Sequence, residues 1–279
     1  MNKKCKICGS ENIENVTIGN TKLIKCKDCG VHYLADFGTK EQIDDYYKKD
    51  YVLSSEHIYG PEFRRISRIT EQIELTAEIM NYKKPPAKLL DIGCDRGYFI
   101  DQARRFGYDC TGIELSETAR GYTSLIGLDI QQDIDSLNQK FDVAVMWHVL
   151  EHLPEPIEFL TKLREQLSDD SYLFIRVPAF DSWSRKLFGK YWIWFQPRNH
   201  YFHYTWQSLE ILLQSAGYST ELIEHRKPNN RFSKRQFKTT SALFNSLFNY
   251  KISLRKYLSR KYEDWTGIEL YAVAKISKE

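Results

Sequence analysis

Downstream of residue 85, short apolar runs alternate with amphipathic stretches of helical period. The apolar runs predict strands at residues 88–93, 110–115, 141–147, 171–177, 220–225 and 267–276. The stretches with apolar positions three or four residues apart predict helices at 98–106, 116–126, 156–167 and 206–216. Strands that alternate with helices are typical of a parallel sheet covered on both faces, so we expect an α/β fold.

Upstream of residue 85 the pattern differs. Residues 39–82 are polar with helical spacing, which is clearest at 62–80, and two prolines end that region. Residues 16–24 predict a β-hairpin that turns at Gly19 and Asn20. We therefore expect a small N-terminal unit, a helical linker or lid at 38–84, and an α/β domain at 85–279.

Cysteine spacing identifies the N-terminal unit. Two Cys-x-x-Cys pairs are separated by 17 residues, and they consist of Cys5, Cys8, Cys26 and Cys29. This spacing is typical of a structural zinc site, although two disulfides or chance are alternatives. A closed four-thiolate shell leaves no position for a substrate, so a zinc ion here is structural. We expect residues 1–37 to form a zinc ribbon, which is too small to hold a core without the metal.

Composition and charge narrow the function classes. The 279 residues are 42% hydrophobic and 28% charged, with a net charge of +3, which excludes a histone-like binder or an acidic tail protein. No apolar run is long enough for a membrane span, and the first residues lack the pattern of a signal peptide. We therefore expect a cytoplasmic protein.

Two inserts interrupt the α/β pattern. Residues 180–206 are rich in aromatic side chains, which suit stacking on sugar faces or planar acceptors, or else a lid with its own core. Residues 226–261 hold eleven Lys and Arg and no Asp or Glu, so the rest of the chain is acidic on balance. A basic helical insert of this kind can dock on the domain, contact an anionic membrane surface, or bind the phosphate of an acceptor.

Candidate ligand-binding residues follow the predicted strands, because ligands of open α/β sheets bind beyond the carboxyl ends of the strands. The first strand leads into residues 91–97, whose glycines let the backbone approach a ligand at a helix N-terminus. This segment is neither a dinucleotide fingerprint nor a P-loop. Glu114 follows the second strand and could accept both hydroxyls of a ribose.

Residues 90–97, then Glu114, then 141–153 resemble, in this order, the class I S-adenosylmethionine methyltransferases. The resemblance covers roughly residues 85–277, and it implies a Rossmann-like seven-stranded sheet whose last strand is antiparallel. It also implies S-adenosyl-L-methionine as cofactor. The sequence departs from the family at Asp95, where a glycine is usual. The cofactor-binding residues that the resemblance implies are Asp91, Gly93, Gly97, Glu114, Leu115, Asp133, Ile134, Trp147 and His148.

A narrower resemblance concerns the acceptor. Residues 188–198, together with the four-cysteine start, resemble a subgroup of bacterial methyltransferases associated with surface-glycan and lipid-linked sugar biosynthesis. It implies a small-molecule, glycan or nucleotide-sugar acceptor. Related sugar C-methyltransferases have a further C-terminal domain that this chain is too short to hold, which favours O-methylation.

Methylation of a hydroxyl requires removal of its proton, and a histidine base with a pKa near 7 suits that step. We rank His152 first, His200 second and His148 third as catalytic residues. His148-x-x-Glu151-His152 also matches a zinc-peptidase pattern, but that pattern needs a helix, which the prolines after it would break. A further alternative is that Glu151 and His152 only shape the turn.

Two other functions remain open on the sequence. The first is an RNA methyltransferase that uses the ribbon and the basic insert. The Asn/Asp-Pro-Pro-Tyr signature of many base N-methylating enzymes is missing, so nucleic acid is the less favoured partner. The second is a non-catalytic zinc-ribbon scaffold on a methyltransferase fold, which only Asp95 suggests.

Overall fold

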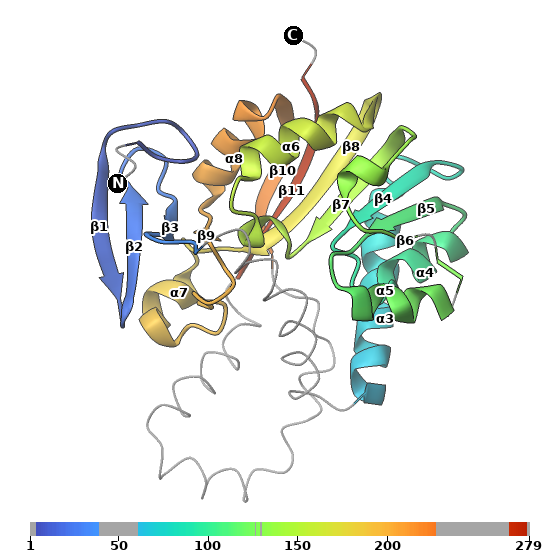
Figure 1. Ribbon diagram of the computed structural model, residues 1–279, viewed down its shortest axis with the longest axis horizontal. Coiled ribbons are helices and arrows are strands. Elements are labelled where there is room, and N and C mark those ends of the chain that lie inside the picture. The colour runs from blue at the N-terminus through green and yellow to red at the C-terminus, as the bar shows by residue number, and fades with distance from the viewer. Residues whose placement is uncertain (1–3, 39–60, 126, 129, 227–267, 278–279) are drawn as a thin grey trace, which may run out of the picture.

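The computed structural model describes residues 4–38, 61–125, 127–128, 130–226 and 268–277. Figure 1 shows a large central sheet flanked by helices, with a smaller sheet at its side that contains the N-terminal strands. The basic insert 226–261, apart from its first residue, lies outside the described residues, as does the linker segment 39–60.

The large sheet has seven strands in the order β10-β11-β8-β7-β4-β5-β6. Strands β4 to β8 are mutually parallel, whereas β11 pairs antiparallel with β8 and with β10, as the family resemblance implies. The chain runs from β4 outward to β6 and then returns to place β7 on the other side of β4. The carboxyl ends of β4 and β7 therefore flank a topological switch point. The strands are β4 Lys88–Ile92, β5 Asp109–Ile113, β6 Ile130–Gln131, β7 Phe141–Trp147, β8 Leu167–Pro178, β10 Tyr218–Arg226 and β11 Glu269–Ile276.

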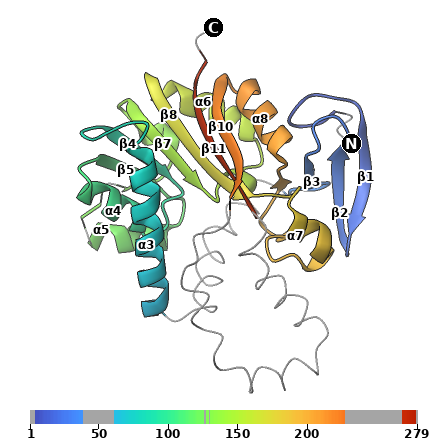
Figure 2. The same ribbon diagram turned by 180° about the vertical axis from the view of Figure 1, so that it is seen from behind.

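Helices bury apolar side chains on both faces of this sheet. Helices α6 Pro156–Glu165 and α8 Trp206–Ser215 pack on one face, where Leu90 of β4 contributes to the core. Helices α3 Pro61–Ile79 and α4 Tyr98–Arg105 pack on the other face, where Leu89 contributes. Figure 2 shows α3 on the face opposite α6 and α8. This alternation along one strand explains why the parallel strands read as continuous apolar runs.

The predicted helix boundaries are close to the observed ones, and within the large sheet β8 and β6 depart most from prediction. Helix α5 spans Glu117–Leu125, and the Ser116 hydroxyl accepts the Ala119 N–H at its start. Strand β8 begins at Leu167 rather than residue 171, in a polar stretch where hydrophobicity gave no signal. Strand β6 has only two residues and was not predicted as a strand, because a strand this short leaves no periodic pattern.

The N-terminal segment folds as a small antiparallel sheet. Strands β1 Ile13–Ile18 and β2 Thr21–Cys26 form the predicted hairpin, with Gly19 at a φ of 64° in its two-residue turn. Strand β3 His32–Leu34 follows, and it pairs with β9 Phe202–His203 from the aromatic insert. The N-terminal sheet is therefore completed by a strand from the α/β domain, which sequence spacing did not predict.

The aromatic insert mainly packs on itself and on this small sheet. Within it, α7 Trp183–Phe188 begins with the Ser182 hydroxyl accepting the Arg185 N–H. Five of its Phe, Tyr and Trp residues are buried, namely Phe180, Trp192, Tyr201, Phe202 and Tyr204. This observation favours the interpretation of the insert as a lid with its own core. In the described part of the chain, no helix combines the length and the apolar character needed to cross a bilayer.

Candidate functional site

Two glycines open the carboxyl edge of the sheet for a ligand. Gly93 follows β4 with a φ of 70°, and a Cβ placed there would lie 2.5 Å from Cγ2 of Val149. Gly97 precedes α4 with a φ of 73°, and its Cβ would lie 2.2 Å from Cδ1 of Leu128. Any other residue at either position would meet both backbone strain and a clash. The glycines thus keep the turn between β4 and α4 close to its neighbours.

The residue between these glycines explains the departure from the family pattern. Asp95 has a φ of 48°, in the left-handed region that glycine adopts most easily and that Asp tolerates better than most residues. Its backbone N–H donates to Oε2 of Glu114 at 2.9 Å. The turn therefore forms with aspartate in place of glycine.

Two buried carboxyl groups lie beneath this turn. Burial raises the pKa of Asp91 well above its usual value, and the nearby Glu114 and Asp95 add to the effect. Burial also raises the pKa of Glu114, although it accepts the Ser116 N–H at 2.8 Å as well as that of Asp95. A carboxyl group held in this way suits a ligand that brings a cationic group or hydroxyl donors. Asp91 and Glu114 therefore fit the ammonium and ribose hydroxyls of S-adenosylmethionine.

The predicted adenine-side residues follow two neighbouring strands. The Glu114 N–H donates to the Gln131 carbonyl, which joins the ends of β5 and β6. Leu115 is 48% exposed, so its side chain is open to an apolar contact. The Asp133 carboxylate accepts the N–H and hydroxyl of Ser136, at the start of the 3₁₀ turn Ile134–Ser136, and Ile134 is buried. Asp133 thus has a local capping role at this edge.

Trp147 ends strand β7 and His148 follows it, and their side chains lie in different surroundings. Trp147 packs in the core against Phe99. His148 has a φ of 58°, and its ring stacks on Trp194 with a centroid distance of 5.0 Å. Its Nε2 lies 3.2 Å from a carboxylate oxygen of Glu269.

The charge state of His148 argues against it as the general base. Burial opposes its charge, but the carboxylates of Glu269 and Glu151 outweigh that effect and raise its pKa to about 9. His148 is therefore mostly an imidazolium near neutral pH and has no lone pair for a proton. This weakens the third-ranked catalytic prediction.

A buried ion network supports His148 from below, and sequence reasoning missed it. Arg176 of β8 donates to Glu269 of β11 and, at 2.7 Å, to Glu71 of α3. Burial would raise the pKa of Glu269, but Arg176 and His148 lower it to about 2. The available signal was a charged residue beside the apolar core of each of two strands, Arg176 and Glu269, because such a residue is rarely buried without a partner.

A second cluster contains the two best-ranked histidines. The short 3₁₀ turn Leu150–His152 carries Glu151 and His152, and the aromatic insert brings His200 beside them. The rings of His152 and His200 lie 4.7 Å apart, edge to face. One ligand-type atom from each of the three residues lies within 4.8 Å of the other two. The structure therefore joins two predicted residues that are far apart in the sequence.

Hydrogen bonds orient both rings in this cluster. Nδ1 of His152 lies 2.8 Å from the Asn199 carbonyl, and Nδ1 of His200 lies 3.1 Å from the Trp194 carbonyl. Because a carbonyl only accepts, each Nδ1 donates, and each neutral ring then has its lone pair on Nε2. Burial lowers the pKa of His152, and burial with neighbouring histidines lowers that of His200 well below its usual value.

The remaining histidine of the insert has a structural role. His203 is buried and stacks on Phe180 with a centroid distance of 4.7 Å. Burial lowers its pKa to about 3, so it stays neutral. It pairs with His32 across strands β3 and β9. This confirms the interpretation of His203 as an aromatic-packed residue.

The four N-terminal cysteines converge. Cys5 and Cys29 have sulfurs 3.7 Å apart, and the sulfurs of Cys8 and Cys26 are 3.5 Å apart. All four sulfurs lie within 4.8 Å of one another. A tetrahedral zinc ion with Zn–S bonds of about 2.3 Å would separate its ligands by about 3.8 Å. The four thiols therefore fit zinc.

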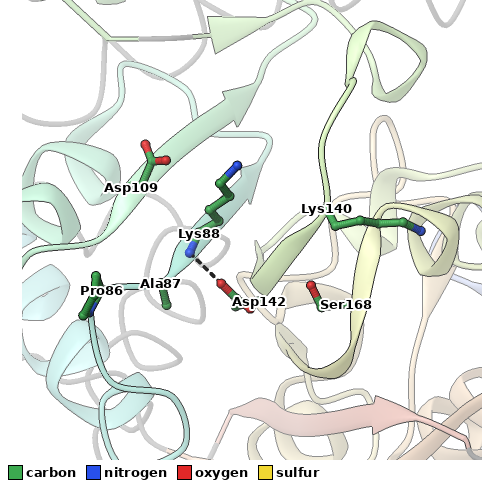
Figure 3. A pocket seen from close by; sticks show the side chains of 7 residues that line it. All are labelled: Pro86, Ala87, Lys88, Asp109, Lys140, Asp142 and Ser168. Atoms are coloured by element: carbon green, nitrogen blue, oxygen red, sulfur yellow. Dashed lines mark hydrogen bonds between the residues drawn. The ribbon is translucent and has the colours of Figure 1, made fainter.

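A cavity of about 460 Å³ lies away from all these groups. Figure 3 shows its lining, which includes Lys88, Asp109 and Asp142 at the amino-terminal starts of β4, β5 and β7. The Lys88 N–H donates to Asp142 there at 2.9 Å. Because ligands of such sheets bind at the opposite, carboxyl edge, this cavity is not the candidate site.

Comparison with known proteins agrees with this geometry. The chain is 32% identical over 118 residues to a ubiquinone biosynthesis O-methyltransferase of Cereibacter sphaeroides. The matched segment covers 37% of this chain and 47% of the relative. It thus spans about half the length of the curated relatives it matches. Magnesium protoporphyrin IX methyltransferase of Synechocystis, solved with bound S-adenosylhomocysteine, shares the fold with a TM-score of 0.58 and 15% identity over 86% of this chain and all of that one.

Fold likeness alone does not fix the reaction. The cyclase SpnF also shares the fold, with a TM-score of 0.51 and 19% identity over 74% of this chain and 80% of that one. The assignment rests instead on residues 62–223, more than half of the chain, which match the family described as a methyltransferase domain. The sheet order, the antiparallel β11 and this match lead to one conclusion: the chain belongs to the methyltransferase-domain family, with the class I fold.

Proposed function

We propose that this protein transfers the methyl group of S-adenosyl-L-methionine to a hydroxyl oxygen. The observation that carries the proposal is the position of the His152–His200–Glu151 cluster. It begins two residues after Val149, whose side chain contacts the position where a Cβ of Gly93 would lie. The groups that would activate the acceptor therefore lie close in sequence to a residue that contacts the turn that would hold the cofactor. The names of the relatives support oxygen as the methylated atom.

The cofactor supplies an electrophilic methyl group, and this chain's residues hold and orient it. Asp91 would pair with the ammonium of the methionine moiety, and Glu114 would accept the ribose hydroxyls. Leu115 and Ile134 would contact the adenine, with Asp133 near its amino group. Gly93 and Gly97 would let the backbone approach the ligand.

The acceptor hydroxyl would lie on the side of the two histidines. The His152 Nε2 can accept the hydroxyl proton because Nδ1 is committed to the Asn199 carbonyl. His200 is the second candidate, with the same arrangement toward the Trp194 carbonyl. Trp194, stacked on His148, offers an aromatic edge for the acceptor.

Two classes of hydroxyl acceptor are candidates for this protein. A sugar or glycan hydroxyl is the first candidate, since the aromatic insert and four-cysteine segment resemble the glycan-associated subgroup. A phenolic hydroxyl is the second, because the relatives are named ubiquinone biosynthesis O-methyltransferases. Contact of residues 226–261 with an acceptor phosphate or a membrane surface stays a prediction. A structural zinc ion on the four cysteines would hold the small sheet to which β9 belongs.

Transfer of radiolabelled methyl from S-adenosylmethionine tests the proposal. The acceptors would be nucleotide sugars and glycan fragments, a set of catechols, and total RNA. We expect label in a hydroxyl acceptor, and a Glu114→Gln variant should bind the cofactor at least about tenfold more weakly, a loss of about 1.4 kcal/mol. Label in RNA alone, or no cofactor binding by the wild-type protein, would contradict it.

A further inference from the structure

We propose that Glu151, His152 and His200 bind one divalent transition-metal ion, at a site separate from the cysteine cluster. Among the described residues, these three form a compact set of one carboxylate and two imidazoles. Imidazole and carboxylate together suit ions such as Zn²⁺, Fe²⁺, Co²⁺ and Mn²⁺.

The two histidine rings are oriented as metal ligands usually are. A metal-bound histidine usually donates its other ring N–H to a backbone carbonyl or a carboxylate, which fixes the ring and exposes the ligating nitrogen. His152 does this toward Asn199 and His200 toward Trp194. In both rings Nε2 is therefore the nitrogen that can bind a metal. The carbonyl that orients His152 is 47 residues away in the sequence, and the one that orients His200 is 6 residues away.

The carboxylate of Glu151 is buried without hydrogen bonds among the described residues. Its side chain is 1% exposed, and in the described part of the chain neither carboxylate oxygen has a hydrogen-bond partner. His148 lies 3.5 Å from one oxygen, but that pair lacks hydrogen-bond geometry. A buried carboxylate without such partners is costly, so each case calls for an explanation. A bound cation would satisfy the orphaned oxygens.

The candidate ligand atoms of Glu151, His152 and His200 are also close enough together to hold one ion. Ligand atoms that lie about 2.0–2.2 Å from a metal are separated from one another by roughly 3–4 Å. The three atoms here lie within 4.8 Å, so only a small contraction is needed to close around an ion. The short turn and the insert are already joined, because the Tyr201 N–H donates to the Glu151 carbonyl.

This site would deepen the proposed function, on which its role in catalysis rests. With the ion bound, the acceptor oxygen is a further ligand, and the metal lowers the pKa of that hydroxyl. The hydroxyl proton passes to solvent water, and the oxygen then bonds to the methyl carbon as the carbon–sulfur bond breaks and its electron pair stays on sulfur. His152 would serve as the proton acceptor only without the ion.

Cobalt binding to the zinc-loaded full-length protein tests this inference. Calorimetry should show one equivalent of Co²⁺ beyond the zinc, and visible absorption should lack the intense thiolate band that cobalt in the cysteine site would give. Glu151→Gln and His200→Ala should each weaken binding at least tenfold. The control is His225→Ala, because His225 lies outside the cluster and pairs with Asp181.

A second readout guards against variants that fail to fold. In metal-free protein, Glu151→Gln removes a buried carboxylate that accepts no hydrogen bond among the described residues, and Glu269 still pairs with His148, so its melting temperature should stay close to that of the wild type. Added Co²⁺ should raise the melting temperature of the wild type and of His225→Ala but not that of Glu151→Gln. No second equivalent, a thiolate band, or equal binding by Glu151→Gln would overturn the inference. Methyl transfer by a protein that binds no cobalt here would leave the proposed function standing.

Discussion

The backbone N–H of Tyr201 donates to the carbonyl oxygen of Glu151 at 2.8 Å, which ties the aromatic insert to the turn that carries the candidate acceptor site. The Tyr201 carbonyl in turn accepts the N–H of Leu34 at 2.9 Å. One residue thus joins the small N-terminal sheet to the Glu151 turn. The Thr205 hydroxyl adds a second link to this sheet, because it donates to the Cys29 carbonyl at 3.2 Å.

Loss of the cysteine site should therefore affect the acceptor more than the cofactor. A Cys29→Ser variant should lose zinc and loosen the links to residues 199–205, which raises the acceptor KM by about tenfold or more while cofactor affinity changes little. Metal analysis, steady-state kinetics and cofactor calorimetry would measure this. Lys22→Ala, an exposed position in the same hairpin, is the control. Equal weakening of cofactor and acceptor binding would argue against the coupling.

Adding one methyl group at Gly93 should disrupt the cofactor turn. Gly93→Ala meets Val149 at 2.5 Å and forces a φ of 70° on alanine, so we expect a loss of about 1–3 kcal/mol in stability and weaker cofactor binding. Val149→Ala in the same protein should recover part of the loss. Denaturant unfolding and calorimetry would measure both.

The matched control for that substitution is Gly121→Ala. Gly121 lies in α5, and a Cβ there meets nothing within 4 Å. Alanine is the better helix residue by about 1 kcal/mol, so this variant should be slightly more stable. If Gly93→Ala behaved like Gly121→Ala, the close approach of the turn would be disproved.

Replacing Asp95 by glycine should restore the family pattern at no cost to stability. Its φ of 48° costs a non-glycine residue about 1 kcal/mol, and its charge contributes to the raised pKa of Asp91. We expect Asp95→Gly to be as stable as wild type or more so, and to bind the cofactor about as tightly or up to tenfold tighter. Cofactor calorimetry measures this. Marked weakening would show that the aspartate side chain itself holds the ligand.

Glu269 should stabilise the fold in a pH-dependent manner. Its pKa in the folded protein is lowered to about 2, so its contribution is present above its unfolded pKa of about 4.3 and is lost as the pH falls toward 2. Glu269→Gln leaves the buried Arg176 paired with Glu71 alone and removes the carboxylate beside His148, so it should cost about 3 kcal/mol near neutral pH. Unfolding followed between pH 3 and 7 should show the difference shrinking on the acid side. A difference independent of pH would count against this network.

The sequence indicated the fold because parallel strands buried on both faces are apolar throughout, and each is followed by a helix of clear period. It also indicated the cofactor edge, because Gly93, Gly97 and Glu114 occupy fixed positions after strands. It did not indicate the pairing of β3 with β9, since a two-residue strand has no pattern of its own. Nor did it show which partner a lone charge such as Arg176 would take.

The candidate acceptor site shows the same limit. His152 and His200 were each singled out for their chemistry, yet nothing in the sequence brings residues so far apart to a ring distance of 4.7 Å. That contact depends on Tyr201 and on β9, which fold the insert back onto the turn. The local pattern of apolar and polar residues predicts helices and strands, but it does not predict long-range contacts between irregular segments.

The most direct test of the account is single-turnover methyl transfer by His152→Ala and His200→Ala, with cofactor affinity measured in parallel. His225→Ala is the control, since its ring lies outside the cluster. We predict that one or both cluster variants lose about 10²-fold or more in rate while their affinity for S-adenosylmethionine stays within about twofold of wild type. Wild-type rates in both variants would contradict the claim that this cluster activates the acceptor.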